Sequence, residues 1–207
     1  MEKRPGSGLE PVHVWIAPAG DEPRSAAHNL LLDLASTLVS SPALRHEPSG
    51  KPCIDGLAVS ISHSRELVAV AASQAGPVGV DVEDHAARDV TALARRWFDP
   101  GELAWMSAQA DELTAFLQLW TAKEAVGKAL GNGLRKAGLR RRMPLGGGRV
   151  ESAPDLLVTH LPIQVDAVLA VAVAAAATDV LVTEHQGTAL RRTVRSRTSF
   201  PVVVQGN

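Results

Sequence analysis

Two short apolar segments far apart in the chain nearly repeat each other, and this echo constrains the fold more than any other feature. Residues 67–72 read LVAVAA and residues 169–174 read LAVAVA. Short apolar runs of this kind are typical of buried strands. Two halves of similar design would produce the echo, and so would a general bias toward Ala and Val. Taken alone, the compositional bias is the simpler source.

The spacing of apolar residues predicts strands and helices in succession along the chain. Strands are expected at 12–16, 57–62, 67–73, 78–83 and within 165–177. One helix should begin at residues 21–23, and a longer one should run from a cap at Asp111 to about Leu130. Asp99-Pro100-Gly101-Glu102 combines an N-cap, a Pro at the first helical position and an acid three residues after the cap.

Composition and charge narrow the class of protein. Hydrophobic residues make up 45% of the 207 and charged residues 21%, as in soluble globular proteins. Aromatic residues are only 3%, too few for stacking platforms, so we expect no nucleic-acid partner. Cys53 is the only cysteine, which excludes a disulfide within the chain and a thiolate zinc site.

No segment of the sequence reads as a membrane span or a secretory signal. The longest apolar run, 167–177, has 11 residues, whereas a span needs about 20. No apolar segment follows the N-terminal residues, so we expect a cytoplasmic protein without membrane contact. The net charge of −1 hides an uneven distribution. Residues 1–128 carry 11 basic and 17 acidic groups, while 129–207 carry 10 and 5, so the second part could attract an acidic partner or a polyphosphate.

The first candidate site is the expected strand 78–83. Because strand side chains alternate, three valines face one side while Gly79, Asp81 and Glu83 face the other. Two carboxylates so close together repel, and a hard divalent cation is one way to compensate them. A solvated strand face is the simpler interpretation when the segment is judged alone.

The second candidate is the helix 113–130. Its apolar face, which includes Phe116 and Trp120, continues in steps of four to Glu124 and then Lys128. A carboxylate and an ammonium on the buried side are costly unless they are paired or functional. A surface ion pair four residues apart is the alternative, and the two interpretations are balanced.

The third candidate is Ser62-His63-Ser64, preceded by Gly50-Lys51-Pro52. Hydroxyl, imidazole and ammonium groups suit phosphate binding. Adjacent residues on an extended chain point apart, so His63 and its serine neighbours do not form a nucleophile and base pair. A turn histidine with capping hydroxyls remains the simpler interpretation for this segment alone.

Taken in order, these motifs resemble the 4′-phosphopantetheinyl transferases. The motifs are 50–52, 62–64, 79–83 and the run WTAKEAVGK at 120–128. The length resembles the Sfp-type branch, in which two pseudo-symmetric halves share one chain. The resemblance implies an α+β fold with two such subdomains, each a small, mainly antiparallel sheet packed with helices, and a site at their junction. We expect halves at 1–86 and 87–189, and an Arg-rich tail at 190–207 that can be disordered.

The resemblance also implies an activity and partners. A monomer would transfer 4′-phosphopantetheine from coenzyme A to a serine of an acyl or peptidyl carrier protein, releasing adenosine 3′,5′-bisphosphate. Asp81, Glu83 and Glu124 would hold Mg²⁺. Glu124 would act as base toward the serine hydroxyl, directly or through a metal-bound water, and Lys128 would neutralise charge on the phosphate. The residues implied to bind coenzyme A are Arg45, Lys51, Pro52, Ser62, His63 and Lys123.

Some assignments stay open. Glu102 is either a further site residue or only the partner in a helix cap. The basic cluster 135–142 docks an acidic carrier or is a solvated loop. For the whole chain, the alternatives are a non-catalytic module that binds coenzyme A or a carrier protein, and another Mg²⁺-dependent phosphotransferase.

Overall fold

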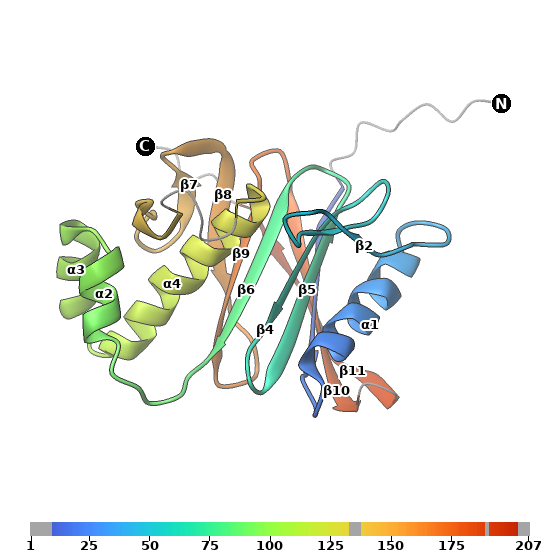
Figure 1. Cartoon of the computed structure of the whole chain (residues 1–207), viewed down its shortest axis with the longest axis horizontal. Coiled ribbons are helices and arrows are strands. Elements are labelled where there is room, and N and C mark those ends of the chain that lie inside the picture. Colours follow the sequence, from blue (N-terminus) through green and yellow to red (C-terminus); the bar gives the residue numbers. More distant parts are fainter. Residues whose placement is uncertain (1–9, 133–137, 189–190, 203–207) are drawn as a thin grey trace.

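The apolar strands form two β-sheets that pack face to face, with helices on both outer sides (Figure 1). This computed structural model describes residues 10–132, 138–188 and 191–202. The first sheet has the order β11-β10-β1-β5-β4 and the second the order β6-β9-β8-β7. Within the described residues, neighbouring strands pair antiparallel, apart from β1 and β10, which run parallel.

The strands of the first sheet are β1 (Val12–Pro18), β4 (Ala58–His63), β5 (Leu67–Ser73), β10 (Asp179–Thr188) and β11 (Arg191–Pro201). Those of the second are β6 (Val78–Asp84), β7 (Gly148–Val150), β8 (Ala153–Leu161) and β9 (Ala167–Ala174), and a small separate hairpin joins β2 (Arg45–His46) and β3 (Pro52–Cys53). The helices are α1 (Pro23–Ser36), α2 (Thr91–Trp97), α3 (Pro100–Ser107), α4 (Glu112–Ala129) and the short 3-10 turn η1 (Gly138–Arg140).

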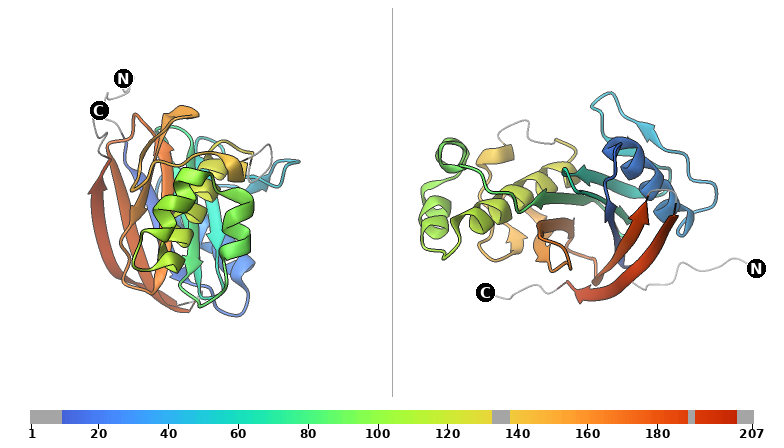
Figure 2. Two further views of the ribbon diagram at one scale, coloured as in Figure 1. Left: turned by 90° about the vertical axis from the view of Figure 1, so that its left-hand side faces the viewer. Right: turned by 90° about the horizontal axis from the view of Figure 1, so that it is seen from below.

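Three apolar clusters hold the layers together, one at each interface. The inner faces of the two sheets share the central cluster, to which β6 contributes Val78, Val80 and Val82. A second cluster joins α1 to the outer face of the first sheet, and a third joins α4, with α2 and α3, to the outer face of the second. Figure 2 shows α1 and the α2–α4 group at opposite ends of the molecule.

The two halves share one topology, which confirms the expected α+β fold with pseudo-symmetric subdomains. Each half is a strand, a helix and an antiparallel hairpin: β1-α1-β4-β5 in the first and β6-α4-β8-β9 in the second. In both, the second hairpin strand lies between the other two, in the orders β1-β5-β4 and β6-β9-β8. The repeated segments 67–72 and 169–174 lie in these central strands, β5 and β9. The echo therefore marks equivalent positions in the two sheets, all buried except the partly exposed Ala174, and it reflects the repeated topology as well as composition.

The predicted helix ends are confirmed at atomic detail. Asp99 and Glu102 form the reciprocal capping box of α3, and Asp111 accepts hydrogen bonds from the N–H groups of Leu113 and Thr114 at the start of α4. Helix α4 ends at Ala129, and Gly131 follows with a φ of 69°, a left-handed conformation that suits glycine.

Two strands cross the limits expected for the halves. Strand β6, placed in the first half, pairs with β9 of the second sheet, and β10, placed in the second half, pairs with β1 of the first. The Arg-rich tail differs more: residues 191–201 form β11 rather than a disordered segment, because β10 offers a pairing edge and Phe200 reaches the central cluster. Each helix in the described ranges is too short or too polar to span a membrane.

Candidate active site

Strand β6 and helix α4 approach each other closely enough to bring their polar side chains together. A Cβ at Gly79 would lie 1.9 Å from the carbonyl oxygen of Ala125 and 2.7 Å from the amide nitrogen of Ala129. Only a residue without a side chain fits there. The alternation of β6 then directs Asp81 and Glu83 to the same side as Gly79, against α4, which carries Glu124 and Lys128.

Asp81 is the most constrained of these side chains. Its Oδ1 accepts hydrogen bonds from the Lys128 ammonium and from the Ser62 hydroxyl, each at 2.7 Å. The same ammonium donates to the carbonyl oxygen of Val80 at 3.0 Å. Asp81 is 5% exposed, and its Oδ2 is buried without a hydrogen-bond partner among the described residues. A buried carboxylate oxygen with free lone pairs is costly unless something else binds it.

Glu124 lies half-buried beside these carboxylates. Burial first, and then the nearby charges of Asp81 and Glu83, raise its pKa to about 7 against the opposing charge of Lys128. Its proton therefore exchanges near neutral pH, which is the range that suits a general base. Glu83 points toward solvent more than Asp81 does, and Arg88 donates to its Oε2 at 2.9 Å.

The three carboxylates expected to hold Mg²⁺ are neighbours but not a closed cluster. Within 10–132, 138–188 and 191–202, no three His, Cys, Asp or Glu side chains converge closely enough to form a ready-made metal site. The physical reason is their charge. Lys128 forms an ion pair with Asp81, Arg88 forms one with Glu83, and burial disfavours the ionised form of Glu124. The donor set still fits Mg²⁺, since all are carboxylates and Asp81 Oδ2 is free.

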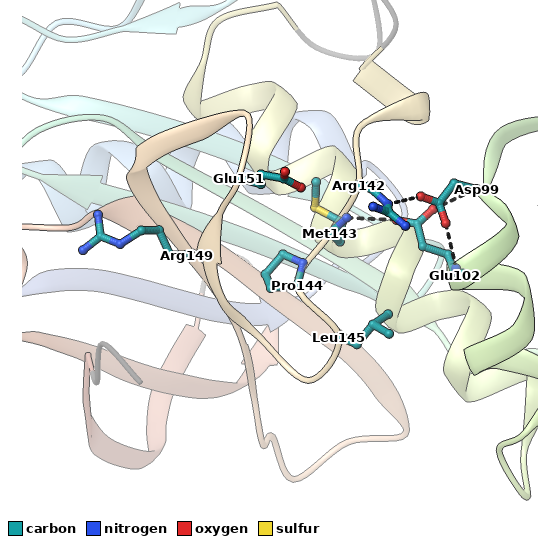
Figure 3. A pocket seen from close by; sticks show the side chains of 9 residues that line it. Asp99, Glu102, Arg142, Met143, Pro144, Leu145, Arg149 and Glu151 are labelled. Atoms are coloured by element: carbon teal, nitrogen blue, oxygen red, sulfur yellow. Dashed lines mark hydrogen bonds and ion pairs between the residues drawn. The ribbon is translucent and has the colours of Figure 1, made fainter. Parts of the chain in front are cut away.

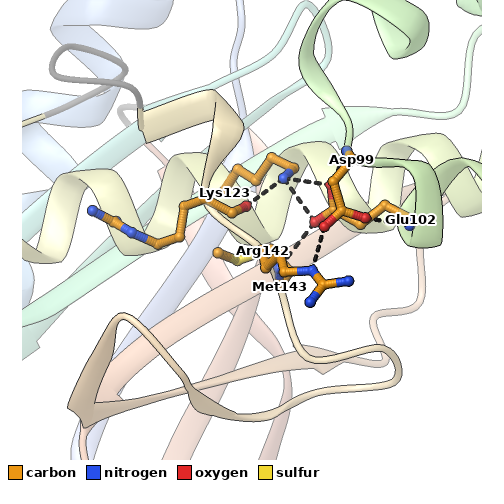
Figure 4. A network of polar contacts seen from close by, with 6 residues as sticks. Asp99, Glu102, Lys123, Arg142 and Met143 are labelled. Carbon is orange, nitrogen blue, oxygen red and sulfur yellow. Dashed lines mark hydrogen bonds and ion pairs between the residues drawn. The ribbon is translucent and has the colours of Figure 1, made fainter.

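Lys123 does not lie where the sequence resemblance puts it. Its side chain is fully buried, and its ammonium donates to both carboxylate oxygens of Glu102, at 2.7 and 2.8 Å, and to the carbonyl oxygen of Arg141 (Figure 4). Burial lowers the pKa of Lys123, and the Glu102 carboxylate opposes that change. The structure therefore does not support the implied coenzyme A contact, because the ammonium is already engaged. Successive helical residues point about 100° apart, so Lys123 faces α3 while Glu124 faces β6.

The same contacts settle the role of Glu102. It completes the cap of α3, neutralises Lys123 and accepts the N–H of Met143 at 2.9 Å, so it fastens the segment after η1 to two helices. A cavity of about 210 Å³ lies beside this network (Figure 3). Its rim carries charged groups that are already engaged, Arg142 with Asp99 and Arg149 with the carbonyl of Pro154. None of the expected catalytic or metal-binding residues lines it.

The residues expected to bind coenzyme A are only partly brought together. The Lys51 ammonium lies by Gly131, 3.4 Å from where a Cβ would be, at the C-terminal end of α4. Among the described residues it has no ion-pair partner, and the exposed His63 ring has no hydrogen-bond partner. Arg45 instead pairs with Asp55 across the β2–β3 hairpin, in which Pro52 also lies. Ser62 is buried against Asp81, so its hydroxyl is already engaged.

The site also contains residues that the motifs did not single out. Asp84 accepts hydrogen bonds from the Ser64 hydroxyl at 2.6 Å and from the main-chain N–H groups of Arg65 and Glu66. It therefore fixes the turn next to His63. Arg88 neutralises Glu83 from just after β6. Asp84 directly follows the Asp81–Glu83 pair in the sequence, and this proximity is the feature that could have identified it as a residue of the site.

Comparison with known proteins finds similarity over part of the chain. Residues 77–150 match the family model of the 4′-phosphopantetheinyl transferase superfamily, which confirms the resemblance at that level. A segment of 93 residues, 44% of this chain, is 38% identical to the 4′-phosphopantetheinyl transferase gsp of Aneurinibacillus migulanus. The 4′-phosphopantetheinyl transferase HetI of a Nostoc species is 34% identical over 100 residues, 44% of this chain.

A third relative extends the comparison to another organism. The 4′-phosphopantetheinyl transferase AcpT of Salmonella typhi is 36% identical over 104 residues, which are 47% of this chain. The chain spans 38%, 42% and 54% of the length of gsp, HetI and AcpT, respectively. The family model covers the segment that holds Asp81, Glu124 and Lys128.

Proposed function

We propose that this chain, whose residues 77–150 match the family model of the 4′-phosphopantetheinyl transferase superfamily, moves phosphopantetheine from coenzyme A to a carrier-protein serine. The protein would act as an Sfp-type monomer in the cytoplasm, on an acyl or peptidyl carrier protein. The observation that carries the proposal is that two carboxylates with different properties, Asp81 and Glu124, lie near each other. Asp81 keeps a free, buried Oδ2 beside Lys128, and Glu124 has a pKa of about 7.

The chemistry needs one proton acceptor and one place for negative charge. The serine oxygen attacks the phosphorus that carries the pantetheine arm, and the bond from that phosphorus to the departing adenosine 3′,5′-bisphosphate breaks. Glu124 takes the serine proton, since a pKa of about 7 leaves a large ionised fraction near neutral pH. The Lys128 ammonium donates a hydrogen bond to Asp81, and it would stabilise the negative charge that builds on the phosphate.

Mg²⁺ would be held by Asp81, Glu83 and Glu124, and when bound it would neutralise charge on the pyrophosphate oxygens. Support comes from the free Asp81 Oδ2 and from a donor set made only of carboxylate oxygens. Lys51 and His63 would contact the 3′-phosphate end of coenzyme A, because both lack a partner among the described residues. Arg45 is a weaker member of this set, since Asp55 already neutralises it.

The test is a mass measurement on intact carrier proteins. A panel of apo acyl and peptidyl carriers is incubated with the protein and coenzyme A, in Mg²⁺ or in EDTA. We expect one carrier or more to gain one phosphopantetheine in Mg²⁺ and none to gain it in EDTA.

Two other results would favour the alternatives. Coenzyme A binding by calorimetry without mass gain on any carrier would identify a binding module. A preference for a nucleoside triphosphate over coenzyme A as the donor would identify another phosphotransferase.

A further inference from the structure

Two serines on β4, and a third directly after it, join the two halves of the molecule at the place where the candidate active site lies. Strands β4 and β6 belong to different sheets, and the main chain of β4 pairs with β5. From residue 60 on, every second residue on the side turned to β6 is a serine: Ser60 and Ser62 on β4, and Ser64 just after it. The other face carries Val59 and Ile61, which pack under α1.

Each serine hydroxyl contacts β6 twenty residues further along the chain. Val80 N–H donates to Ser60 Oγ at 3.0 Å, Val82 N–H donates to Ser62 Oγ at 3.4 Å, and Ser64 Oγ donates to Asp84 at 2.6 Å. The constant offset means that the two strands run side by side in parallel, as Figure 1 shows. Side-chain hydroxyls therefore replace the main-chain hydrogen bonds that would otherwise join two such edges.

Ser62 differs from the other two because it also reaches the candidate metal ligand. Its hydroxyl lies 2.7 Å from Asp81 Oδ1, and Ser62 and Asp81 are 6% and 5% exposed. A hydroxyl has one hydrogen to donate. Since Val82 N–H occupies a lone pair of Ser62 Oγ, the hydroxyl hydrogen is directed to Asp81.

This contact decides which way the Asp81 carboxylate turns. Oδ1 receives two donors, one from β4 and one from α4, and Oδ2 receives none. The Lys128 side chain is long and flexible and is 25% exposed, so alone it would follow the carboxylate rather than fix it. The short serine side chain on a paired strand is the rigid member of the pair.

We propose that Ser62 is a positioning residue, which holds Asp81 Oδ1 so that Oδ2 is presented to a divalent cation, and that it is not a coenzyme A contact. The inference rests on the proposed function for its biological meaning. It assigns a structural role between the two halves to Ser62, the first serine of the Ser-His-Ser motif. The neighbouring His63 remains the residue of the motif that would contact the substrate.

Ser62→Ala and Ser60→Ala form a matched pair for the test. Both residues are buried hydroxyls on one face of β4, both accept a main-chain N–H of β6, and only Ser62 touches Asp81. The first readout is Mn²⁺ binding without substrate, followed by electron paramagnetic resonance. Loss of a partner that orients a metal ligand typically weakens metal affinity 10–100-fold, so we expect at least about tenfold for Ser62→Ala. We expect less than about twofold for Ser60→Ala, and recovery in Ser62→Thr.

The second readout is binding of adenosine 3′,5′-bisphosphate in EDTA, by calorimetry. We expect the same affinity in the wild type and in Ser62→Ala. In the transfer assay, Ser62→Ala should raise the Mg²⁺ concentration for half-maximal rate while the KM for coenzyme A stays constant.

Several results would overturn the inference. One is weaker nucleotide binding in EDTA with unchanged Mn²⁺ affinity, which would make Ser62 a substrate contact. Another is equal loss of Mn²⁺ affinity in both alanine variants, which would make its role purely structural. A wild-type protein that binds no Mn²⁺ would also overturn it. If the wild type binds Mn²⁺ with the expected Ser62 dependence but modifies no carrier, the proposed function fails and the positioning role stands.

Discussion

Helix α4 carries two lysine–carboxylate pairs five residues apart, and the two differ in whether anything is left to bind. Lys123 and Glu102 are fully enclosed, and additional main-chain partners complete their hydrogen bonding. Lys128 and Asp81 are joined at the same distance of 2.7 Å, but the lysine is partly exposed and one carboxylate oxygen has no partner in the described structure. We call the first pair closed, because its hydrogen bonding is complete, and the second open, because a carboxylate oxygen remains for a ligand.

The difference separates a structural use of charge from a chemical one. A buried pair is kept when removal of either member would leave a bare charge in the interior. An open pair that stays partly solvated costs less to keep and retains free lone pairs for a ligand. The two pairs should therefore respond in opposite ways, one in stability and the other in activity.

The largest effect should come from opening the closed pair. Lys123→Ala leaves Glu102 buried without its cation, and we expect the free energy of unfolding to fall by about 3–5 kcal/mol in urea denaturation. The double variant Lys123→Met with Glu102→Gln should recover part of that loss, because no ion remains and Gln still accepts the Met143 N–H. A loss below about 1 kcal/mol in the single variant would show that the pair is not closed.

Removing the cation of the open pair should act on the rate instead. We expect Lys128→Ala to lower kcat about 10²–10³-fold, the usual cost of losing one group that stabilises transition-state charge. Its free energy of unfolding should fall less than that of Lys123→Ala, because Lys128 is partly solvated and Ser62 still donates to Asp81 Oδ1. Steady-state transfer kinetics and urea denaturation on the same preparation check both values. Equal damage to both quantities would erase the contrast with Lys123.

The pKa of Glu124 predicts a pH dependence of stability confined to the open site. Its folded-state pKa of about 7 lies above the usual 4.5, so between these values the folded protein holds a proton that the unfolded chain has lost. Stability must therefore fall as pH rises from about 4.5 to 7. Measured in EDTA, Glu124→Gln should exceed the wild type by about 1–2 kcal/mol above pH 7, after allowance for partial exposure, relative to their difference at pH 4. A difference that does not change with pH would place Glu124 outside the carboxylate cluster.

The smallest effect concerns the basic segment that follows α4. Arg140 lies over the Trp97 ring, whereas Arg141 has one guanidinium nitrogen buried and its carbonyl bound to Lys123. Residues 135–137 of the proposed docking cluster 135–142, including Arg135, lie outside the described residues. Arg140→Glu alone should raise the KM for an acidic carrier a few-fold at low salt, with less effect at high salt. An unchanged KM at low salt would leave this segment as a solvated loop.

The sequence predicted what depends on local spacing. Strands β1, β4, β5 and β6 and the caps Asp99 and Asp111 follow from alternation and from residue types at helix ends, which are properties of a few adjacent residues. Strand β11 was missed, because an arginine-rich segment becomes a strand only where another strand offers it an edge.

The side-chain partners were harder, because they come from distant elements. The apolar face of α4 was extended to Glu124 and Lys128, but the fully buried charged residue of the helix is Lys123, whose partner Glu102 is 21 residues away. Ser62 matched a binding motif, while its hydroxyl turns to Asp81 on another sheet. In both cases the partner of the side chain depends on which distant element packs against it, and local sequence spacing does not contain that information.

The most direct test of the open site as the catalytic one is the transfer rate of Glu124→Gln, measured by carrier mass at saturating coenzyme A and Mg²⁺. Proton removal by a positioned base contributes about 10²–10⁴-fold, so we expect kcat to fall by at least 10²-fold while the fold is kept, as urea denaturation would show. Unchanged turnover in Glu124→Gln would contradict the account, because the carboxylate with the pKa of about 7 would then have no part in the reaction.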